Sequence, residues 1–153
     1  MPSKHTTSRP PLAERLWARV DKNGPPPAYR PNLGSCWLWN GPKNNMGYGV
    51  ISGSKGQELV HRTSYRLLEG PIPAGLTLDH LCRVRHCVRP THLEPVTLKA
   101  NVLRGQGASA QHARQTHCQY GHPFDLLNTK IRSDGSRECR ACHLLRRGRN
   151  ADR

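Results

Sequence analysis

Residues 78–96 read LDHLCRVRHCVRPTHLEPV, and this stretch decides the fold. The segment from Leu76 to Leu81 alternates as a strand does, and a short loop rich in arginine and cysteine follows it. His92 to Val96 predicts a second strand, and Thr97 to Leu103 predicts a helix with Thr97 as its N-cap. The order strand, loop, strand, helix predicts a small α+β fold.

The loop between the two predicted strands carries metal-ligand chemistry. Cys82, Cys87 and His92 place two thiols and one imidazole within eleven residues. A structural zinc ion needs four such ligands at tetrahedral corners. Cys36, the remaining cysteine in the first two thirds of the chain, is the predicted fourth ligand and would tie an upstream hairpin to this loop. His86 lies in the same loop and remains an alternative to His92.

A second group of ligands lies near the end of the chain, with the spacing Cys118-x3-His122-x16-Cys139-x2-Cys142. A CxxC pair closes readily on one zinc ion, and a Cys/His pair upstream completes four ligands. His117 and His143 remain alternatives to His122. Between the half-sites, Asp134-Gly135 suits a tight hairpin turn, so residues 117–153 are predicted to form a zinc-ribbon-like module with a basic tail.

The composition explains why metal ions are needed. Only 35% of the 153 residues are hydrophobic, against roughly 45–50% in typical globular domains. The chain also contains 14 glycines and 13 prolines, which favour turns and loops. A large apolar core is therefore excluded, and zinc binding energy is expected to become folding energy.

The net charge of +14 indicates a polyanionic partner. The excess of basic over acidic side chains is six minus two in residues 1–35, eight minus four in residues 36–103, and ten minus four in residues 104–153. The positive charge thus runs along the whole sequence.

The sequence also predicts where the protein acts. No stretch approaches the roughly 18–20 apolar residues of a membrane span, and the opening MPSKHTTSRPP lacks a signal-peptide run. We therefore expect a cytoplasmic protein without membrane partners, in which six cysteines serve as metal ligands. Three disulfides in an exported, toxin-like protein are the alternative.

Four segments are expected along the chain. Residues 1–10 are interpreted as a disordered basic arm, and residues 11–104 as one domain that begins with an amphipathic helix from Leu12 to Val20. Between Cys36 and His61 the punctuated apolar runs predict a small antiparallel hairpin or meander. Residues 105–116 have little to bury and are predicted to be a linker before the 117–153 module.

The pair Asp79-His80, at the end of the first predicted strand, offers catalytic groups. A neutral imidazole can take a proton from water, so His80 is a candidate general base. The carboxylate of Asp79 and the amide oxygen of Asn101 are hard oxygen donors of the kind that magnesium accepts. A divalent ion held there would stabilise charge on a scissile phosphate.

The run LDHLCRVRHCVRPTHLEPV together with Asn101 resembles the HNH, or His-Me finger, endonucleases. The zinc-containing branch is the most similar, which includes intron-encoded homing endonucleases and many small phage and prophage proteins. CWLWNG, the MGYG hairpin and VHRTSYRLLEGPIP also look like that branch, so the resemblance covers about residues 12–104. It implies a ββα-metal domain stabilised by zinc.

Residue by residue, the resemblance implies His80 as general base and Asp79 and Asn101 as ligands of one catalytic divalent ion, for which magnesium is expected. Arg62 would contact the scissile phosphate, with a solvated helix arginine as the alternative, and His61 is interpreted as a core or supporting histidine. The implied ligands of the first structural zinc are Cys36, Cys82, Cys87 and His92. The final module resembles the accessory zinc module found beside HNH domains in phage proteins.

The sequence therefore predicts a metal-dependent DNA endonuclease that leaves 5′-phosphate and 3′-hydroxyl ends, active in a bacterial or phage-infected cell. The partner is expected to be double-stranded DNA, and a homodimer or phage packaging proteins remain open as further partners. A non-catalytic, zinc-dependent nucleic-acid-binding regulator is the alternative function. Phosphate contacts are assigned to the basic side chains of the last module, Arg137, Arg140, Arg146, Arg147 and Arg149.

Overall fold

The computed structural model describes residues 9–151, with side chains described through residue 147. The chain divides between Asn101 and Val102 into two compact units, and each is described by itself. Most of the predicted N-terminal arm, residues 1–8, and the side chain of Arg149 lie outside the described residues. In the part of the chain that the structure describes, no helix is long and apolar enough to cross a bilayer.

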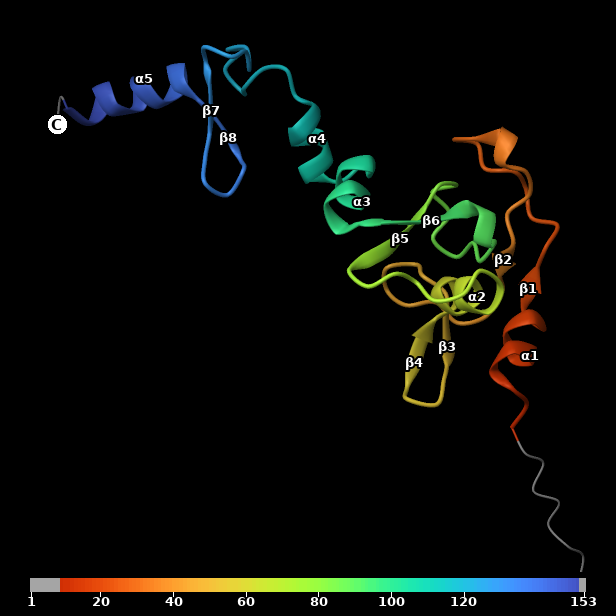
Figure 1. Cartoon of the computed structure of the whole chain (residues 1–153). Coiled ribbons are helices and arrows are strands. Elements are labelled where there is room, and N and C mark those ends of the chain that lie inside the picture. Colours follow the sequence, from red (N-terminus) through yellow and green to blue (C-terminus); the bar gives the residue numbers. More distant parts are fainter. Residues whose placement is uncertain (1–8, 152–153) are drawn as a thin grey trace, which may run out of the picture. The chain divides into compact units, whose positions relative to one another are not determined.

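The first unit consists of short elements (Figure 1). A helix and two strands come first: α1 (Leu12–Trp17), β1 (Val20–Asp21) and β2 (Leu38–Trp39). A hairpin and a helix follow: β3 (Val50–Ser52), β4 (Gln57–Leu59) and α2 (Val60–Leu68). The last group is β5 (Leu76–His80), β6 (Leu93–Thr97) and α3 (Leu98–Arg104), and α3 contains the boundary between the two units. Single 3-10 turns lie at Pro31–Leu33 and Pro90–His92.

The strand, strand, helix order expected from residues 76–103 is present. β5 and β6 pair antiparallel, with His80 opposite Leu93 and Leu76 opposite Thr97. Thr97 caps α3, because its hydroxyl accepts a hydrogen bond from the Ala100 N–H at 3.2 Å. His80 thus ends one strand of a hairpin whose loop carries the predicted zinc ligands.

The upstream segments differ in part from the sequence-based expectation. The first helix ends at Trp17 rather than Val20, because Val20 pairs with Trp39 in the antiparallel ladder of β1 and β2. The predicted hairpin is formed by β3 and β4, with Ile51 opposite Glu58. The NGPPP segment, residues 23–27, lies in the connection from β1 to β2.

The apolar core of the first unit is small. One buried cluster contains Leu16, Trp39, Ile51, Val60 and Val88. The Trp39 ring is fully buried and its indole N–H donates to the Pro42 carbonyl at 2.8 Å, so packing rather than base stacking explains this residue. Five such side chains leave much of the fold to be held by other means.

Gly49 lies where only a hydrogen atom fits. A Cβ at this position would lie 2.4 Å from Cγ2 of Val60 and 2.6 Å from Cδ1 of Trp39. We expect Gly49→Ala to lower the free energy of unfolding by about 1–3 kcal/mol, because it overpacks this core. Thermal unfolding followed by tryptophan fluorescence measures the effect. Ser54→Ala is the control, since Ser54 is exposed in the turn of the β3–β4 hairpin and belongs to the unit that the tryptophans report on; equal melting shifts in both variants would contradict the prediction.

The second unit contains α4 (Ala108–Arg114), the hairpin of β7 (Thr129–Ile131) and β8 (Arg137–Cys139), and α5 (Arg140–Ala151). The structure differs from the predicted linker in containing α4, whose alanine, glutamine and arginine residues favour a helix. The Asp134-Gly135 turn is present, and Gly135 has a φ of +78°, which a side chain would disfavour.

Candidate active site and metal centres

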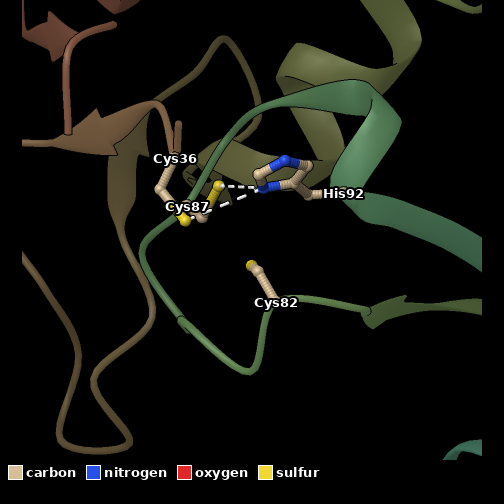
Figure 2. Close-up of side chains that lie close together, drawn as sticks. All are labelled: Cys36, Cys82, Cys87 and His92. Atoms are coloured by element: carbon tan, nitrogen blue, oxygen red, sulfur yellow. Dashed lines mark hydrogen bonds between the residues drawn. The ribbon is translucent and has the colours of Figure 1, made fainter. Parts of the chain in front are cut away.

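The first Cys/His group is brought together in the fold. The ligand atoms of Cys36, Cys82, Cys87 and His92 all lie within 4.8 Å of one another, and all four residues are buried. Figure 2 shows the side chains converging from the segment before β2, the loop after β5 and the turn before β6. His92 Nδ1 lies 3.7 Å from the Cys36 sulfur and 3.6 Å from the Cys87 sulfur.

The imidazole of His92 is oriented for ligation by its other nitrogen. Nε2 lies 3.0 Å from the Leu33 carbonyl oxygen. A carbonyl only accepts, so Nε2 carries the hydrogen and Nδ1 presents a lone pair to the three sulfurs. A second hydrogen bond of this kind is what fixes metal-binding histidines in proteins.

Backbone hydrogen bonds hold the cysteine loop against the segment that carries Cys36. The Val88 N–H donates to the Trp37 carbonyl at 2.8 Å, and the Trp39 N–H donates to the His86 carbonyl at 3.0 Å. His86 therefore contributes its backbone carbonyl to this contact, and the histidine side chain in the ligand cluster is that of His92.

The thiols of this cluster affect one another's ionisation. Burial raises the pKa of Cys36 to about 11. The pKa of Cys82 is also raised, mainly by its hydrogen bond to Cys87 and secondly by burial. The hydrogen bond from Cys82 lowers the pKa of Cys87. Three thiols and one imidazole form the Cys3His donor set of structural zinc, and a divalent cation at their centre would stabilise all three thiolates. The residues therefore fit the ion.

The second Cys/His group is also brought together. The ligand atoms of Cys118, His122, Cys139 and Cys142 lie within 4.8 Å of one another. His122 Nδ1 lies 3.2 Å from the Cys142 sulfur and 3.5 Å from the Cys118 sulfur. Two alternatives for the histidine lie elsewhere: His117 bonds to the Thr116 hydroxyl, and His143 to Glu138.

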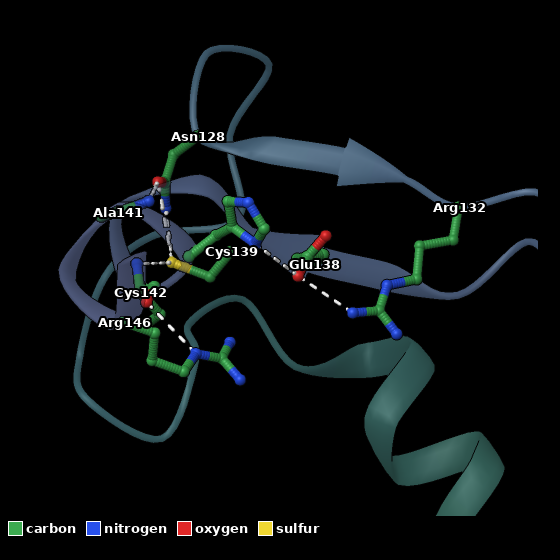
Figure 3. Close-up of polar contacts among 8 residues, drawn as sticks. Asn128, Arg132, Glu138, Cys139, Ala141, Cys142 and Arg146 are labelled. Carbon is green, nitrogen blue, oxygen red and sulfur yellow. Dashed lines mark hydrogen bonds and ion pairs between the residues drawn. The ribbon is translucent and has the colours of Figure 1, made fainter. Parts of the chain in front are cut away.

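Asn128 supports the second cluster from outside. Its amide nitrogen donates to the Cys139 sulfur at 3.3 Å, and its amide oxygen accepts from the Ala141 N–H at 2.9 Å (Figure 3). Burial raises the pKa of Cys139, but hydrogen bonds from the Cys142 N–H and from Asn128 outweigh it and lower the value to about 6. This Cys3His set also fits structural zinc.

The two clusters lie in different units, which gives a clean test. We expect Cys142→Ser to lower the zinc content from two ions to one per chain, while the tryptophan fluorescence melt stays unchanged. All three tryptophans, Trp17, Trp37 and Trp39, are in the first unit, so their fluorescence reports on that unit alone. Elemental analysis and a fluorescence melt measure the two outcomes; an unchanged content of two zinc ions would contradict the assignment.

His80 is buried at the end of β5, with 6% of its surface exposed. Its Nε2 lies 3.1 Å from the Cys87 carbonyl oxygen, so Nε2 donates the hydrogen and Nδ1 keeps its lone pair. Burial lowers the pKa of His80 to about 4. The imidazole is therefore neutral near pH 7, in the form that can accept a proton.

Two aromatic rings surround His80 that sequence analysis had not assigned to it. The His61 ring lies 4.8 Å from the His80 ring, centroid to centroid, and the Tyr48 ring lies 5.9 Å away. Burial lowers the pKa of His61 to about 3, and its Nδ1 has no hydrogen-bond partner among the described residues. His61 belongs to α2 and Tyr48 to the segment before β3. The two residues lie in the VHR and MGYG motifs, and these motifs were the signal in the sequence that could have pointed to them.

Asp79 contacts a partner that the sequence did not indicate. Its Oδ1 accepts a hydrogen bond from Arg83 at 2.6 Å, and only 2% of Asp79 is exposed. Arg83 has a φ of +58°, the left-handed conformation that turns the chain at the start of the cysteine loop. The carboxylate is therefore held as an ion pair close to His80.

The other predicted site residues are placed as follows. Asn101 lies half-buried in α3, and Arg62 lies half-buried in α2 beside His61, where its charge contributes to lowering the pKa of His61. Arg137 stacks on the Phe124 ring at 4.5 Å and donates to the carbonyls of Gln115 and His112. Arg146 donates to the Cys142 carbonyl at 3.2 Å, while Arg140 and Arg147 are exposed.

Comparison with known proteins matches the centre of the chain. The sequence model of the HNH endonuclease family matches residues 58–103, which run from β4 through α3 and include His61, Asp79, His80 and Asn101. The resemblance inferred from the sequence is thereby confirmed over these residues. No solved structure matches the chain.

Three phage proteins are similar over part of their length. Protein 2.8 of Escherichia phage T7 is 36% identical over 66 residues, which are 43% of this chain and 45% of that protein. Protein 7.7 of the same phage is 31% identical over 80 residues, 50% of this chain and 62% of that protein. The uncharacterized gene 5.3 protein of Enterobacteria phage T3 is 30% identical over 60 residues, which are 37% of this chain and 59% of that protein. The chain thus spans about half the length of these relatives.

Proposed function

Because residues 58–103 match the HNH endonuclease family, we propose that this chain is a metal-dependent DNA endonuclease with a ββα-metal fold. It hydrolyses phosphodiester bonds to 5′-phosphate and 3′-hydroxyl ends, with His80 as general base. The observation that carries the proposal is the Nε2 contact of His80 with the Cys87 carbonyl at 3.1 Å, which leaves Nδ1 as the basic atom.

In the proposed reaction, Nδ1 of His80 takes a proton from a water molecule. The oxygen of that water forms a bond to phosphorus, and the bond from phosphorus to the 3′ oxygen breaks with its electron pair on that oxygen, which takes a proton from a solvent water to become the 3′-hydroxyl. A positioned base of this kind typically contributes about 10²–10⁴ in rate. The contact with the Cys87 carbonyl restrains rotation of the ring, and the nearby His61 ring restricts it further.

Asp79 and Asn101 are assigned as ligands of the catalytic ion. A carboxylate oxygen and an amide oxygen suit magnesium, which when bound would stabilise negative charge on the leaving oxygen. Oδ1 of Asp79 accepts a hydrogen bond from Arg83 at 2.6 Å, so an ion bound by Asp79 would share the carboxylate with this guanidinium. Arg62 is assigned to the scissile phosphate, where its guanidinium would pair with phosphate oxygens.

The two Cys/His clusters are assigned to structural zinc and the basic C-terminal side chains to DNA. Residues 11–104 would form the nuclease domain and residues 117–153 the accessory module. Arg140 and Arg147 are exposed and suit phosphate contacts, whereas Arg137 and Arg146 also donate to backbone carbonyls of the second unit, those of Gln115 and Cys142. Arg149 completes the assigned set, and we place the activity in a phage-infected bacterial cell.

A plasmid-nicking assay tests the activity. Zinc-loaded protein is incubated with supercoiled plasmid with and without magnesium, and the ends are mapped by ligation and by phosphatase treatment. We expect nicked or linear product only with a divalent ion, with ligatable 5′-phosphate ends. Binding of the plasmid with no cleavage in any of magnesium, manganese or calcium would instead support the zinc-dependent regulator.

A further inference from the structure

A cavity of about 460 Å³ lies in the first unit between α1 and the β3–β4 hairpin. Three arginines line it, Arg9, Arg15 and Arg19, together with Ser52 and Gln57. Among the described residues that line it, none is acidic and none is aromatic. The cavity is thus positively charged and offers no ring on which a base could stack.

The arginines are only partly satisfied by the protein. Arg15 donates to the Ser52 carbonyl at 2.7 Å, and Arg9 donates to the same oxygen at 3.3 Å. Two guanidinium groups therefore share one neutral acceptor. The Nε of Arg15 is buried and has no hydrogen-bond partner among the described residues. A buried donor without a partner costs free energy, which an acceptor bound in the cavity would recover.

The arrangement also brings like charges together. Arg15 lies in α1 and Arg19 lies two residues after the end of that helix, and both line the cavity, where their like charges repel. The nearest acidic residue of the hairpin, Glu58, instead pairs with Arg66 of α2 at 2.5 Å. Gln57 and Glu58 are neighbours on β4, so their side chains point to opposite faces of the hairpin, and Gln57 is the one that lines the cavity.

We propose that this cavity binds a backbone phosphodiester of DNA away from the scissile bond. Guanidinium groups match phosphate oxygens, and the lack of an aromatic lining favours backbone over base. The inference rests on the proposed function, because it supplies a second contact for the same substrate. Tyr48 packs near His80, and Ile51 of β3, three residues later, lines the cavity. An extended chain spans roughly 10 Å over three residues.

The test measures binding of the full chain, loaded with zinc, to a labelled DNA duplex without magnesium, so that cleavage does not interfere. Fluorescence anisotropy gives the dissociation constant between about 50 and 200 mM salt. We expect Arg19→Gln to reduce the slope of log K against log salt by about 1, and Arg15→Gln/Arg19→Gln to reduce it by about 2. Arg19→Gln is the key variant because, within the described residues, its side chain makes no hydrogen bond that the fold requires.

The matched control removes the same charge outside the cavity. Arg30→Gln/Lys55→Gln changes two exposed side chains of the same unit that do not line the cavity. The proposal would be overturned if Arg15→Gln/Arg19→Gln and this control gave equal salt slopes. A second outcome would also overturn it. Inorganic phosphate would raise the melting temperature of the wild type but not of Arg19→Gln, while the salt slope for DNA stayed the same in both. The cavity would then bind a free anion rather than DNA.

The binding test and the nicking test fail separately. If the salt slope of DNA binding falls in the cavity variants but the wild-type protein does not nick plasmid, the proposed phosphate site is supported and the proposed nuclease activity is contradicted. Nicking by the wild-type protein with unchanged slopes in the cavity variants would contradict the cavity alone.

Discussion

Cys87→Ser is expected to unfold the first unit. Cys87 is fully buried, and its sulfur lies 3.6 Å from Nδ1 of His92 in the four-ligand cluster. Structural zinc in small domains supplies apparent binding free energies of about 10–16 kcal/mol, which become folding free energy. The connected apolar cluster of this unit has five buried side chains, and Val50, Leu78, Leu93 and Val96 are buried outside it, so the apolar core is small and we expect the fold to depend on the ion.

The readout is tryptophan fluorescence, because Trp37 and Trp39 lie in the segment hydrogen-bonded to the cysteine loop. We expect the cooperative thermal transition to be lost, or lowered by well over the roughly 4–8 °C that 1 kcal/mol produces in a domain of this size. Zinc content is expected to fall by at least one ion per chain. Chelation of the wild-type protein should give the same fluorescence change.

Cys142→Ser is the matched control for Cys87→Ser. It replaces one thiol by one hydroxyl in the other cluster, which belongs to the second unit. The fluorescence transition should survive in this variant. If Cys87→Ser keeps both the wild-type transition and two zinc ions, the first cluster does not hold the fold together.

His80→Ala is expected to reduce cleavage by about 10²–10⁴-fold, the contribution of a positioned general base. DNA affinity and zinc content should remain at wild-type values, because neither zinc cluster includes His80. The measurement is the initial rate of plasmid nicking in magnesium, with anisotropy and elemental analysis on the same preparation.

Because His80 is buried, a second variant separates chemistry from folding. His80→Gln keeps an amide N–H that can donate to the Cys87 carbonyl but removes the basic nitrogen. His86→Ala is the control, since His86 lies in the same loop and contributes only its backbone carbonyl to the contact with Trp39. We expect His86→Ala to cleave like the wild type; wild-type rates in His80→Gln would exclude His80 as the base.

The sequence by itself determined the local units of this protein. Cys82, Cys87 and His92 stand in one loop and its flanking turn, and Cys139 and Cys142 stand within one turn, so the chain spacing alone limits how far apart they can lie. The strand, strand, helix order from Leu76 to Arg104, the Thr97 cap and the Asp134-Gly135 turn follow from the same short-range rules. Cys36 was identified because few other cysteines were available.

Only the tertiary structure decided which distant groups meet. It placed His61 and Tyr48 beside His80, paired Arg83 with Asp79, and chose His122 over His117 and His143. It also closed the arginine cavity by bringing α1 onto the β3–β4 hairpin. Such contacts leave no periodic pattern in a sequence, because they depend on how loops of many residues close and on which buried polar groups then find partners.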